Sequence, residues 1–240
     1  DPASLPSVPH FPALEAANEH AAKEVLARVG IPVLPERAAA DLDAACAAAC
    51  ELGYPVALKV LSSDIVHKSE VGGVALDIAD EAGLRQAWAA MRERVAQAAP
   101  RARIEGMLVA PMAPAGVEMI LGVQRDPVFG PVVMVGMGGI YAELLDDVSL
   151  CVAPVDAEGA MRMVRELKAF PLLDGARGRP RADLDALVRA IVRLSVFAHQ
   201  HADRIASIDI NPFRVFEAGR GAAALDAVLL TREAEDGGHA

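Results

Sequence analysis

The sequence of 240 residues contains only three cysteines, Cys46, Cys50 and Cys151. A small and odd number of cysteines argues against a disulfide framework, and no further Cys/His cluster completes a zinc site around Cys46 and Cys50. No apolar run reaches the ~20 residues that cross a bilayer, and the N-terminal stretch lacks the layout of a signal peptide. We therefore expect a cytoplasmic protein with free thiols and no membrane contact.

Aromatic residues and lysine are also scarce. Aromatics make up 4% of the chain, and the only lysines are Lys23, Lys59, Lys68 and Lys168. The formal net charge is −10 at pH 7, which gives no global attraction to a phosphate backbone and argues against a nucleic-acid-binding protein. The hydrophobic fraction of 53% argues against a disordered chain. A local cationic pocket is compatible with this composition.

Apolar periodicity and turn residues predict an α+β protein with two lobes. We expect an extended leader over 1–12, a first lobe over 13–108, a second lobe over 109–230 and a mobile tail over 231–240. The expected helices are 13–29, 44–52, 80–98, 156–167 and 183–202, the last one capped by Asp183. The expected strands are 31–35, 54–61, 74–78, 104–112, 116–124, 131–139, 149–155, 205–216 and 222–229.

Lys59 lies in the apolar strand segment VALKVL. An ammonium group in such surroundings must be paired, because burying an isolated charge is costly. Two interpretations remain open from position alone: a lysine of an edge strand whose head group reaches solvent, or a contact to phosphate in a cleft.

His67 lies in the loop DIVHKSEVGG, which ends in two glycines, three residues after Asp64 and directly before Lys68. A neutral imidazole is a competent nucleophile toward a phosphoryl group. The alternative is a solvated histidine with no role, which is the common case for loop histidines.

Asp209 and Asn211 fall on one face of the expected strand IDINPF, because side chains repeat every second residue. Asp226 lies in the following strand, and antiparallel pairing would bring it to Asn211. Oxygen ligands of this kind suit Mg²⁺, which completes its shell from phosphates and water. The plainer alternative is an Asn-Pro strand end that satisfies its own hydrogen bonds.

Two further segments have weaker signals. The sequence GMGG, ending in Gly138 and Gly139, lacks the spacing of the common phosphate loops, yet its glycines permit a close approach of the backbone to an anion. Arg177, Arg179 and Arg181 form a basic loop on an acidic protein. A solvated turn and the docking of an anionic ligand are both compatible with that loop.

In combination, these segments resemble the ATP-grasp domain of NDP-forming acyl-CoA synthetases, of the β-subunit type. The resemblance covers about residues 14–230. It rests, in order, on AKEVLARVGIPV, GYPVALKVLSSDIVHKSEVGGVAL, GVEMILGVQRDPVFGPVVMVGMGGIYAELLDDV, LLDGARG and DINPFRV. It implies an ATP-grasp fold, in which two α+β lobes hold a nucleotide between antiparallel sheets.

The resemblance also implies roles for individual residues. Lys59 corresponds to the lysine that touches the nucleotide phosphates, and the backbone of Ala110, Pro111 and Met112 corresponds to the hinge that reads adenine. Glu118 falls at the position of a ribose-binding carboxylate, and Gly138 and Gly139 join the nucleotide-binding set. Asn211 and Asp226 correspond to Mg²⁺ ligands, while Glu143 fits the motif without an assigned role.

His67 resembles the second phosphohistidine of these enzymes, which passes phosphate between the acyl/CoA site on another domain and ADP/ATP. Asp209 would either orient that histidine or join the metal shell. The implied reaction is acyl-CoA + ADP + Pi ⇌ carboxylate + CoA + ATP. The family's CoA-binding and ligase domains have no counterpart in this chain, so either a separate α-type subunit supplies them or the chain is an excised or degenerate copy. The alternative is a non-catalytic ATP-binding sensor or assembly module that retains the fold.

Overall fold

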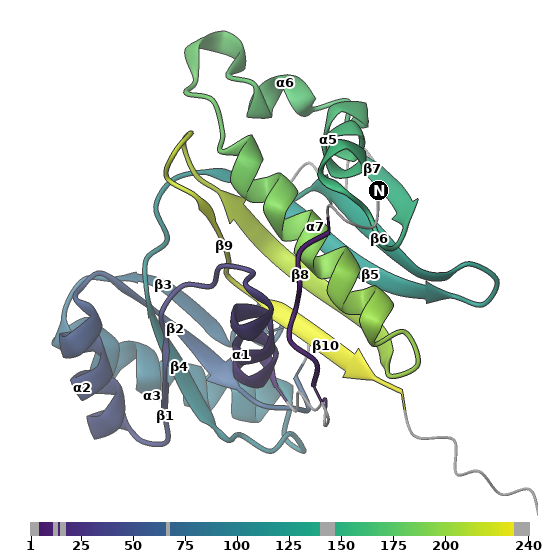
Figure 1. The fold of residues 1–240 in the computed structure, drawn as a ribbon. Coiled ribbons are helices and arrows are strands. Elements are labelled where there is room, and N and C mark those ends of the chain that lie inside the picture. Colours follow the sequence, from purple (N-terminus) through teal and green to yellow (C-terminus); the bar gives the residue numbers. More distant parts are fainter. Residues whose placement is uncertain (1–4, 12–13, 15–17, 66–67, 140–146, 233–240) are drawn as a thin grey trace, which may run out of the picture. The chain divides into compact units, whose positions relative to one another are not determined.

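The computed structural model describes residues 5–11, 14, 18–65, 68–139 and 147–232. The chain divides into two compact units (Figure 1), and each is described by itself. Unit 1 comprises Asp1–Ala16, Ala21–Val33 and Ala115–Ala240, and unit 2 comprises Ala17–His20 and Leu34–Pro114. Each unit contains an antiparallel sheet with helices packed on it, which confirms the predicted α+β class.

Unit 2 is built on a four-stranded sheet in the order β1-β4-β2-β3, with every neighbouring pair antiparallel. The strands are β1 (Arg37–Ala39), β2 (Val56–Leu61), β3 (Val74–Ile78) and β4 (Gly106–Pro111). Val56, Leu58 and Val60 of β2 belong to the core beneath α2 and α3. Because side chains alternate along a strand, Lys59 lies on the opposite face of this sheet.

The two helices of unit 2 begin at aspartate caps. In α2 (Leu42–Leu52) the Asp41 carboxylate accepts a hydrogen bond from the backbone N–H of Ala44 at 2.8 Å. In α3 (Glu81–Ala98) Asp80 accepts from the N–H of Gly83 at 2.8 Å. Both bonds satisfy donors that have no partner within the helix. The caps therefore fix where the helices that cover the sheet begin.

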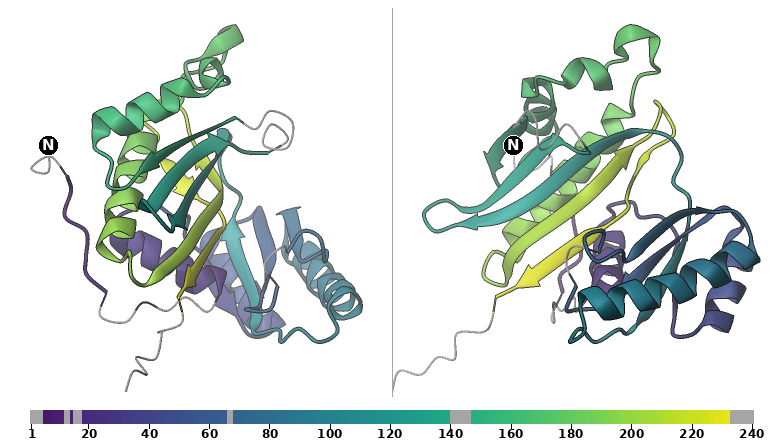
Figure 2. Two further views of the ribbon diagram at one scale, coloured as in Figure 1. Left: turned by 90° about the vertical axis from the view of Figure 1, so that its right-hand side faces the viewer. Right: turned by 180° about the vertical axis from the view of Figure 1, so that it is seen from behind.

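Unit 1 is built on a six-stranded antiparallel sheet in the order β10-β8-β5-β6-β7, with β9 also paired to β8. Helix α7 (Leu184–Gln200) lies along one face of this sheet and contacts β5, β6 and β8 (Figures 1 and 2). The strands are β5 (Val117–Asp126), β6 (Gly130–Met137), β7 (Val148–Val152), β8 (Ile205–Val215), β9 (Ala222–Ala224) and β10 (Ala227–Thr231).

Helix α7 begins at the predicted cap. Asp183 accepts hydrogen bonds from the N–H groups of Ala186 at 3.0 Å and Gly221 at 2.8 Å. Helix α5 (Ala157–Glu166) packs against α7, and two short helices, α6 (Phe170–Leu173) and η2 (Ala176–Gly178), follow it. The single core of unit 1 joins these helices to the sheet.

Helix α1 (Glu19–Val29) buries Ala22, Val25, Leu26 and Val29 in the core of unit 1. The grouping differs from the expected division at residues 108 and 109, which assigned this whole helix to the first lobe. The helix has an apolar face that packs with Val8 and Phe11 in the same core. Sequence order alone does not reveal such packing.

The expected strand over 31–35 is wrong. Residue 33 makes only an isolated bridge to Ala224, and the strand β1 begins four residues later. Pro32 and Pro35 lack an N–H group and cannot donate to a strand ladder. The three cysteines are free, as expected, and none of the helices in the described ranges is long and apolar enough to span a bilayer.

Candidate functional site

Lys59 lies in an interior strand of unit 2, between β4 and β3. The interpretation of Lys59 as a residue of an edge strand is therefore wrong. Its ammonium group lies 2.8 Å from Oε1 of Glu19, and the ammonium group of Lys68 lies 3.0 Å from Oε2 of the same carboxylate. The side chains of Glu19, Lys68 and Lys59 are 1%, 5% and 14% exposed. One buried carboxylate thus holds two ammonium groups.

The segment expected to read adenine forms the end of β4. Ala110 and Pro111 pair with Ala57 and Val56 of β2, and the N–H of Met112 donates to the carbonyl of Pro55 at 3.1 Å. All three residues of the segment are partly exposed. This strand end is in the same sheet as Lys59, so unit 2 holds two of the predicted nucleotide-binding elements.

In unit 1, three predicted nucleotide-binding residues line one pocket of about 340 Å³. They are Glu118 of β5 and the pair Gly138 and Gly139 that follows β6. The N–H of Gly138 donates to the carbonyl of Glu118 at 2.8 Å, and a Cβ at Gly138 would lie 3.0 Å from the backbone carbon of Glu118. Gly139 has φ +62°, a conformation that favours glycine. The pocket also includes Arg179 of the basic loop.

The Glu118 carboxylate forms an ion pair with Arg214, which lies opposite it on β8. Both side chains are partly exposed, at 35% for Glu118 and 21% for Arg214. A carboxylate in this setting keeps acceptor capacity beyond one guanidinium contact. It is chemically able to accept a hydrogen bond from a hydroxyl group in the pocket.

Asn211 and Asp226 are adjacent across the β8–β10 pair. The N–H of Asn211 donates to the backbone carbonyl of Asp226 at 3.2 Å, and the next residues, Ile210 and Ala227, are in register. Asp209 and Asn211 are exposed, whereas Ile208 and Ile210, which alternate with them, are buried in the core. The predicted alternation along this strand is confirmed, and it places polar groups on the sheet face away from α7.

The donor types at this position fit Mg²⁺. Asn211 and Asp226 offer neutral and anionic oxygen atoms, and Mg²⁺ commonly takes one or two protein oxygens and fills its shell with phosphates and water. Within the described residues no group of three or more His, Cys, Asp and Glu side chains forms a complete metal site.

Asp209 lies opposite Gly122 of β5 and lines a second pocket of unit 1, with a volume of about 510 Å³. The pocket is partly apolar, with Met134 and Leu150 among its lining residues, and Arg125 is the basic one. The two roles considered for Asp209 remain open. His67 and Glu143 lie outside the described residues.

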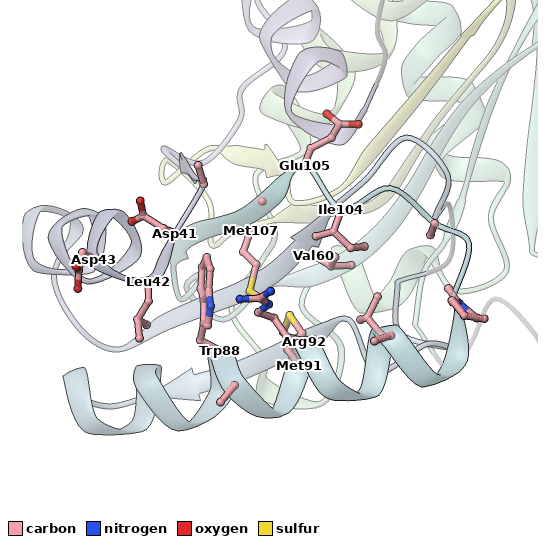
Figure 3. A pocket seen from close by; sticks show the side chains of 18 residues that line it. Asp41, Leu42, Asp43, Val60, Trp88, Met91, Arg92, Ile104, Glu105 and Met107 are labelled. Carbon is pink, nitrogen blue, oxygen red and sulfur yellow. The ribbon is translucent and has the colours of Figure 1, made fainter.

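Unit 2 contains a cavity of about 1000 Å³ that holds none of the predicted site residues (Figure 3). Trp88, Met91 and Arg92 extend into it from α3 toward Met107 of β4. The floor is apolar, and Asp41 and other charged residues line its margin. No local sequence pattern predicts this cavity, since its residues come from separate elements.

Sequence reasoning missed Glu19, Lys68 and Arg214 as members of these sites. The pairs that involve them join residues far apart in the chain: 40 positions separate Glu19 from Lys59, and 96 separate Glu118 from Arg214. The one sequence signal for this site was the scarcity of lysine. The chain has only four lysines, and two of them pair with the Glu19 carboxylate. No local sequence pattern identifies Glu19 as the partner of these lysines.

The two antiparallel α+β units and their sites define the ATP-grasp class. A family model described as an ATP-grasp domain matches residues 14–230. The β subunit of acetate–CoA ligase (ADP-forming) II from Pyrococcus furiosus is 40% identical over 217 residues, which cover 90% of this chain and 92% of that subunit. The chain therefore belongs to the ATP-grasp family, in the branch formed by the β subunits of ADP-forming acyl-CoA synthetases, which are acid–thiol ligases.

Two further similarities bear on function. Acetate–CoA ligase (ADP-forming) I from Archaeoglobus fulgidus is 45% identical over 195 residues, 81% of this chain but 28% of that longer protein. A solved structure of the dinucleotide-forming acetyl-coenzyme A synthetase 1 from Ca. Korarchaeum cryptofilum matches with TM-score 0.76 and 38% identity, covering 89% of this chain and 92% of that one. It contains coenzyme A and Mg-AMPPCP, with the phosphohistidine segment pointing towards the nucleotide binding site.

Proposed function

We propose that this chain is the nucleotide-binding, phosphoryl-transferring subunit of an ADP-forming acyl-CoA synthetase. The reaction is acyl-CoA + ADP + Pi ⇌ carboxylate + CoA + ATP. An α-type partner subunit would carry the CoA-binding and ligase domains, in keeping with the longer single-chain relative, of which this chain matches 28%. The main support is the pocket of unit 1, where Glu118, Gly138 and Gly139 come together.

The residues of unit 1 suit the ribose and phosphate parts of a nucleotide. The Glu118 carboxylate would accept a hydrogen bond from a ribose hydroxyl, and the lack of side chains at Gly138 and Gly139 would let the ligand approach the backbone closely. Asn211 and Asp226 would hold Mg²⁺. The ion would supply charge neutralisation on the phosphate oxygens during in-line transfer.

The residues of unit 2 suit the adenine and phosphate charge. The backbone at Ala110–Met112 would read the adenine edge, as backbone donors and acceptors commonly do in small-molecule sites. Lys59, held by Glu19 at 2.8 Å, would contact the nucleotide phosphates. A fixed ammonium group costs little reorganisation when phosphoryl transfer begins.

His67 is the proposed carrier of the phosphoryl group on this chain. Its imidazole nitrogen would accept the phosphoryl group as the bond to the previous carrier breaks. It would then pass the group to the terminal phosphate oxygen of ADP, leaving a free imidazole. Asp209 would orient this histidine or contribute to the metal shell, the two alternatives that the sequence leaves open. Holding the group on nitrogen avoids its loss to water.

The proposal is tested by incubating the chain and its partner subunit with Mg-ATP labelled in the γ-phosphate. We expect acid-labile, base-stable label on this chain, and we expect His67→Ala to abolish it. His199→Ala is the matched control, because His199 is an exposed residue near the end of α7. Label that persists on this chain in His67→Ala would assign the carrier to another of its residues, and turnover that survives the substitution without such label would assign the carrier to a histidine of the partner. Absence of nucleotide binding by the wild-type chain would contradict the whole proposal.

A further inference from the structure

The basic loop of unit 1 places one of its arginines in the pocket that contains Glu118. Arg179 lines this pocket of about 340 Å³ together with Glu118, Gly138 and Gly139. The side chain of Arg179 is exposed, and within the part of the chain that the structure describes its guanidinium group has no ion pair and no hydrogen bond. The pocket of three predicted nucleotide-binding residues therefore also contains a guanidinium group whose N–H donors are not used by the described residues.

The backbone of the loop holds Arg179 at the pocket. The N–H of Ala182 donates to the carbonyl of Leu173 at 2.9 Å, which closes the loop at its base. Within the loop, Gly175 has φ +90°, and a Cβ there would lie 2.9 Å from the carbonyl oxygen of Arg179. Pro180 restricts the residue before it to extended conformations, and Arg179 has φ −73° and ψ 149°. The loop backbone is thus fixed, and the side chain of Arg179 is the part that can adapt to a ligand.

Two other arginines of unit 1 differ from Arg179 in their contacts. Arg181 lies in the same loop, and its Nε is 3.4 Å from Oδ1 of Asp174. Arg214 forms the ion pair with Glu118. Glu118 is the one acidic residue among the described residues that line the pocket, and its carboxylate is engaged with Arg214. An anionic ligand in the pocket therefore meets a cation, Arg179, for which no described carboxylate competes.

The chemistry of the pocket matches the ribose–phosphate part of a nucleotide. A guanidinium group presents a planar fork of N–H donors that fits the oxygen atoms of a phosphate group. The Glu118 carboxylate accepts hydrogen bonds, which a ribose hydroxyl can donate. Gly138 and Gly139 have no side chains that would keep a ligand away from the backbone. Because the first phosphate is joined to the ribose through its 5′ carbon and oxygen, one pocket with an acceptor and a donor fork can hold both.

We propose that Arg179 is a phosphate-binding residue of this pocket, and that its guanidinium group contacts the phosphate that adjoins the ribose of a bound nucleotide. The inference rests on the proposed nucleotide-binding function and adds to it a residue of the basic loop. For Arg179 it favours the docking of an anionic ligand over a solvated turn, whereas Arg181 has its partner within the loop.

The test compares arginine variants of this loop by isothermal titration on the full chain at a fixed Mg²⁺ concentration. We expect Arg179→Met to weaken the binding of ADP and of AMP alike, by about tenfold each, the scale of one hydrogen bond to a charged group. Adenosine, which has no phosphate, should bind to Arg179→Met as it does to the wild type. Arg179→Lys keeps the charge but not the fork, and ADP should bind to it within about threefold of the wild type.

The controls separate a phosphate contact from a general effect of the loop. Arg181→Met is the matched variant, because it removes the same type of side chain two residues away and breaks an exposed ion pair, which contributes little to stability. It should leave the ADP dissociation constant unchanged. Arg179→Glu should weaken ADP binding more than Arg179→Met does, since a carboxylate repels phosphate but can still accept a hydrogen bond from a hydroxyl group. Circular dichroism verifies that each variant is folded.

Several outcomes would overturn the inference. They are an unchanged ADP dissociation constant in Arg179→Met, an equal loss of adenosine binding, an unchanged affinity for AMP, or an effect of the same size in Arg181→Met. If adenosine binds too weakly to titrate, Arg179→Glu decides, because ADP binding no weaker than in Arg179→Met would contradict a phosphate contact. A wild-type chain that binds neither ADP nor ATP would instead refute the proposed function, so the two failures are distinguishable.

Discussion

Unit 2 keeps Glu19, Lys59 and Lys68 in its interior, whereas unit 1 places Asp209 and Asn211 at exposed strand positions. In the buried group, ion pairs with one carboxylate hold two ammonium groups in position. The exposed group carries oxygen atoms that a cation from solvent can reach. The contrast suggests that the cationic part of the site is built during folding, while the anionic part is completed by a ligand.

The ion pairs of the two units differ in the same way. Glu19 is 1% exposed, but the Glu118 and Arg214 side chains of unit 1 are 35% and 21% exposed. Exposed pairs contribute little to stability because solvent screens them, while breaking a buried pair leaves a charge that neither water nor a partner compensates. Breaking an ion pair should therefore cost more stability in unit 2 than in unit 1.

The largest expected effect is that of Glu19→Ala on stability. Removing this carboxylate takes the shared partner from two largely buried ammonium groups, which should lower the free energy of unfolding by about 3–5 kcal/mol. Glu118→Ala is the matched variant in unit 1 and should cost about 1 kcal/mol or less. Urea unfolding followed by circular dichroism measures both.

Trp88, the only tryptophan of the chain, lies in unit 2, and its fluorescence reports that unit separately. The signal should shift in Glu19→Ala and remain as in the wild type in Glu118→Ala. Equal losses of stability in the two variants would contradict the expected difference between buried and exposed ion pairs.

A smaller effect is expected for Asp226→Asn. The variant keeps the side-chain shape but removes one negative ligand charge, and the affinity of an oxygen site for a divalent cation depends on that charge. We expect the Mg²⁺ concentration that supports half-maximal ADP binding to rise about tenfold, equivalent to about 1.4 kcal/mol. ADP binding without Mg²⁺ should not weaken.

Asp203→Asn serves as the control for Asp226→Asn, since Asp203 is an exposed carboxylate of the same unit. It should leave the Mg²⁺ dependence unchanged. Identical Mg²⁺ dependence in Asp226→Asn and the wild type would contradict a role of Asp226 as a Mg²⁺ ligand. The alternative interpretation, an Asn-Pro strand end that satisfies its own hydrogen bonds, would then be preferred.

Local signals in the sequence were enough for most helices and strands. Asp183 and Asp80 were identified as helix starts because capping depends on residues three positions apart. The pairing of Asn211 with Asp226 also followed from local information, since a short connection between two strands favours antiparallel neighbours. These predictions needed only periodicity and chain order.

The remaining features depend on contacts that periodicity does not encode. Glu19 lies 40 residues from Lys59, and neither residue type determines the other at that distance. The prediction of a strand over 31–35 was wrong because it relied on the apolar residues of that segment and neglected its two prolines. The roles of Lys59 and Glu118 came from family resemblance, whereas the partners Glu19 and Arg214 required the fold.

The smallest expected effect concerns pH and His201, a buried residue of unit 1. Burial chiefly lowers the pKa of His201, and the nearby His10 and Arg204 lower it further, while the Pro9 carbonyl and Asp203 act in the opposite direction. The ring packs against Phe11 and Phe197. The fold therefore disfavours the protonated form of the His201 imidazole.

The sign of the pH effect follows from proton binding. Above the ordinary histidine pKa of about 6.5, both the folded and the unfolded chain carry a neutral His201 and the stability is fully present. As the pH falls below that value, the unfolded chain takes up a proton more readily than the folded chain, so stability decreases, by at most about 1.4 kcal/mol per pH unit.

His201→Phe should flatten this dependence between pH 7.5 and 5.5 in urea unfolding, and His199→Gln, at an exposed position, should not. A His201→Phe chain as acid-sensitive as the wild type would show that the pH dependence arises elsewhere.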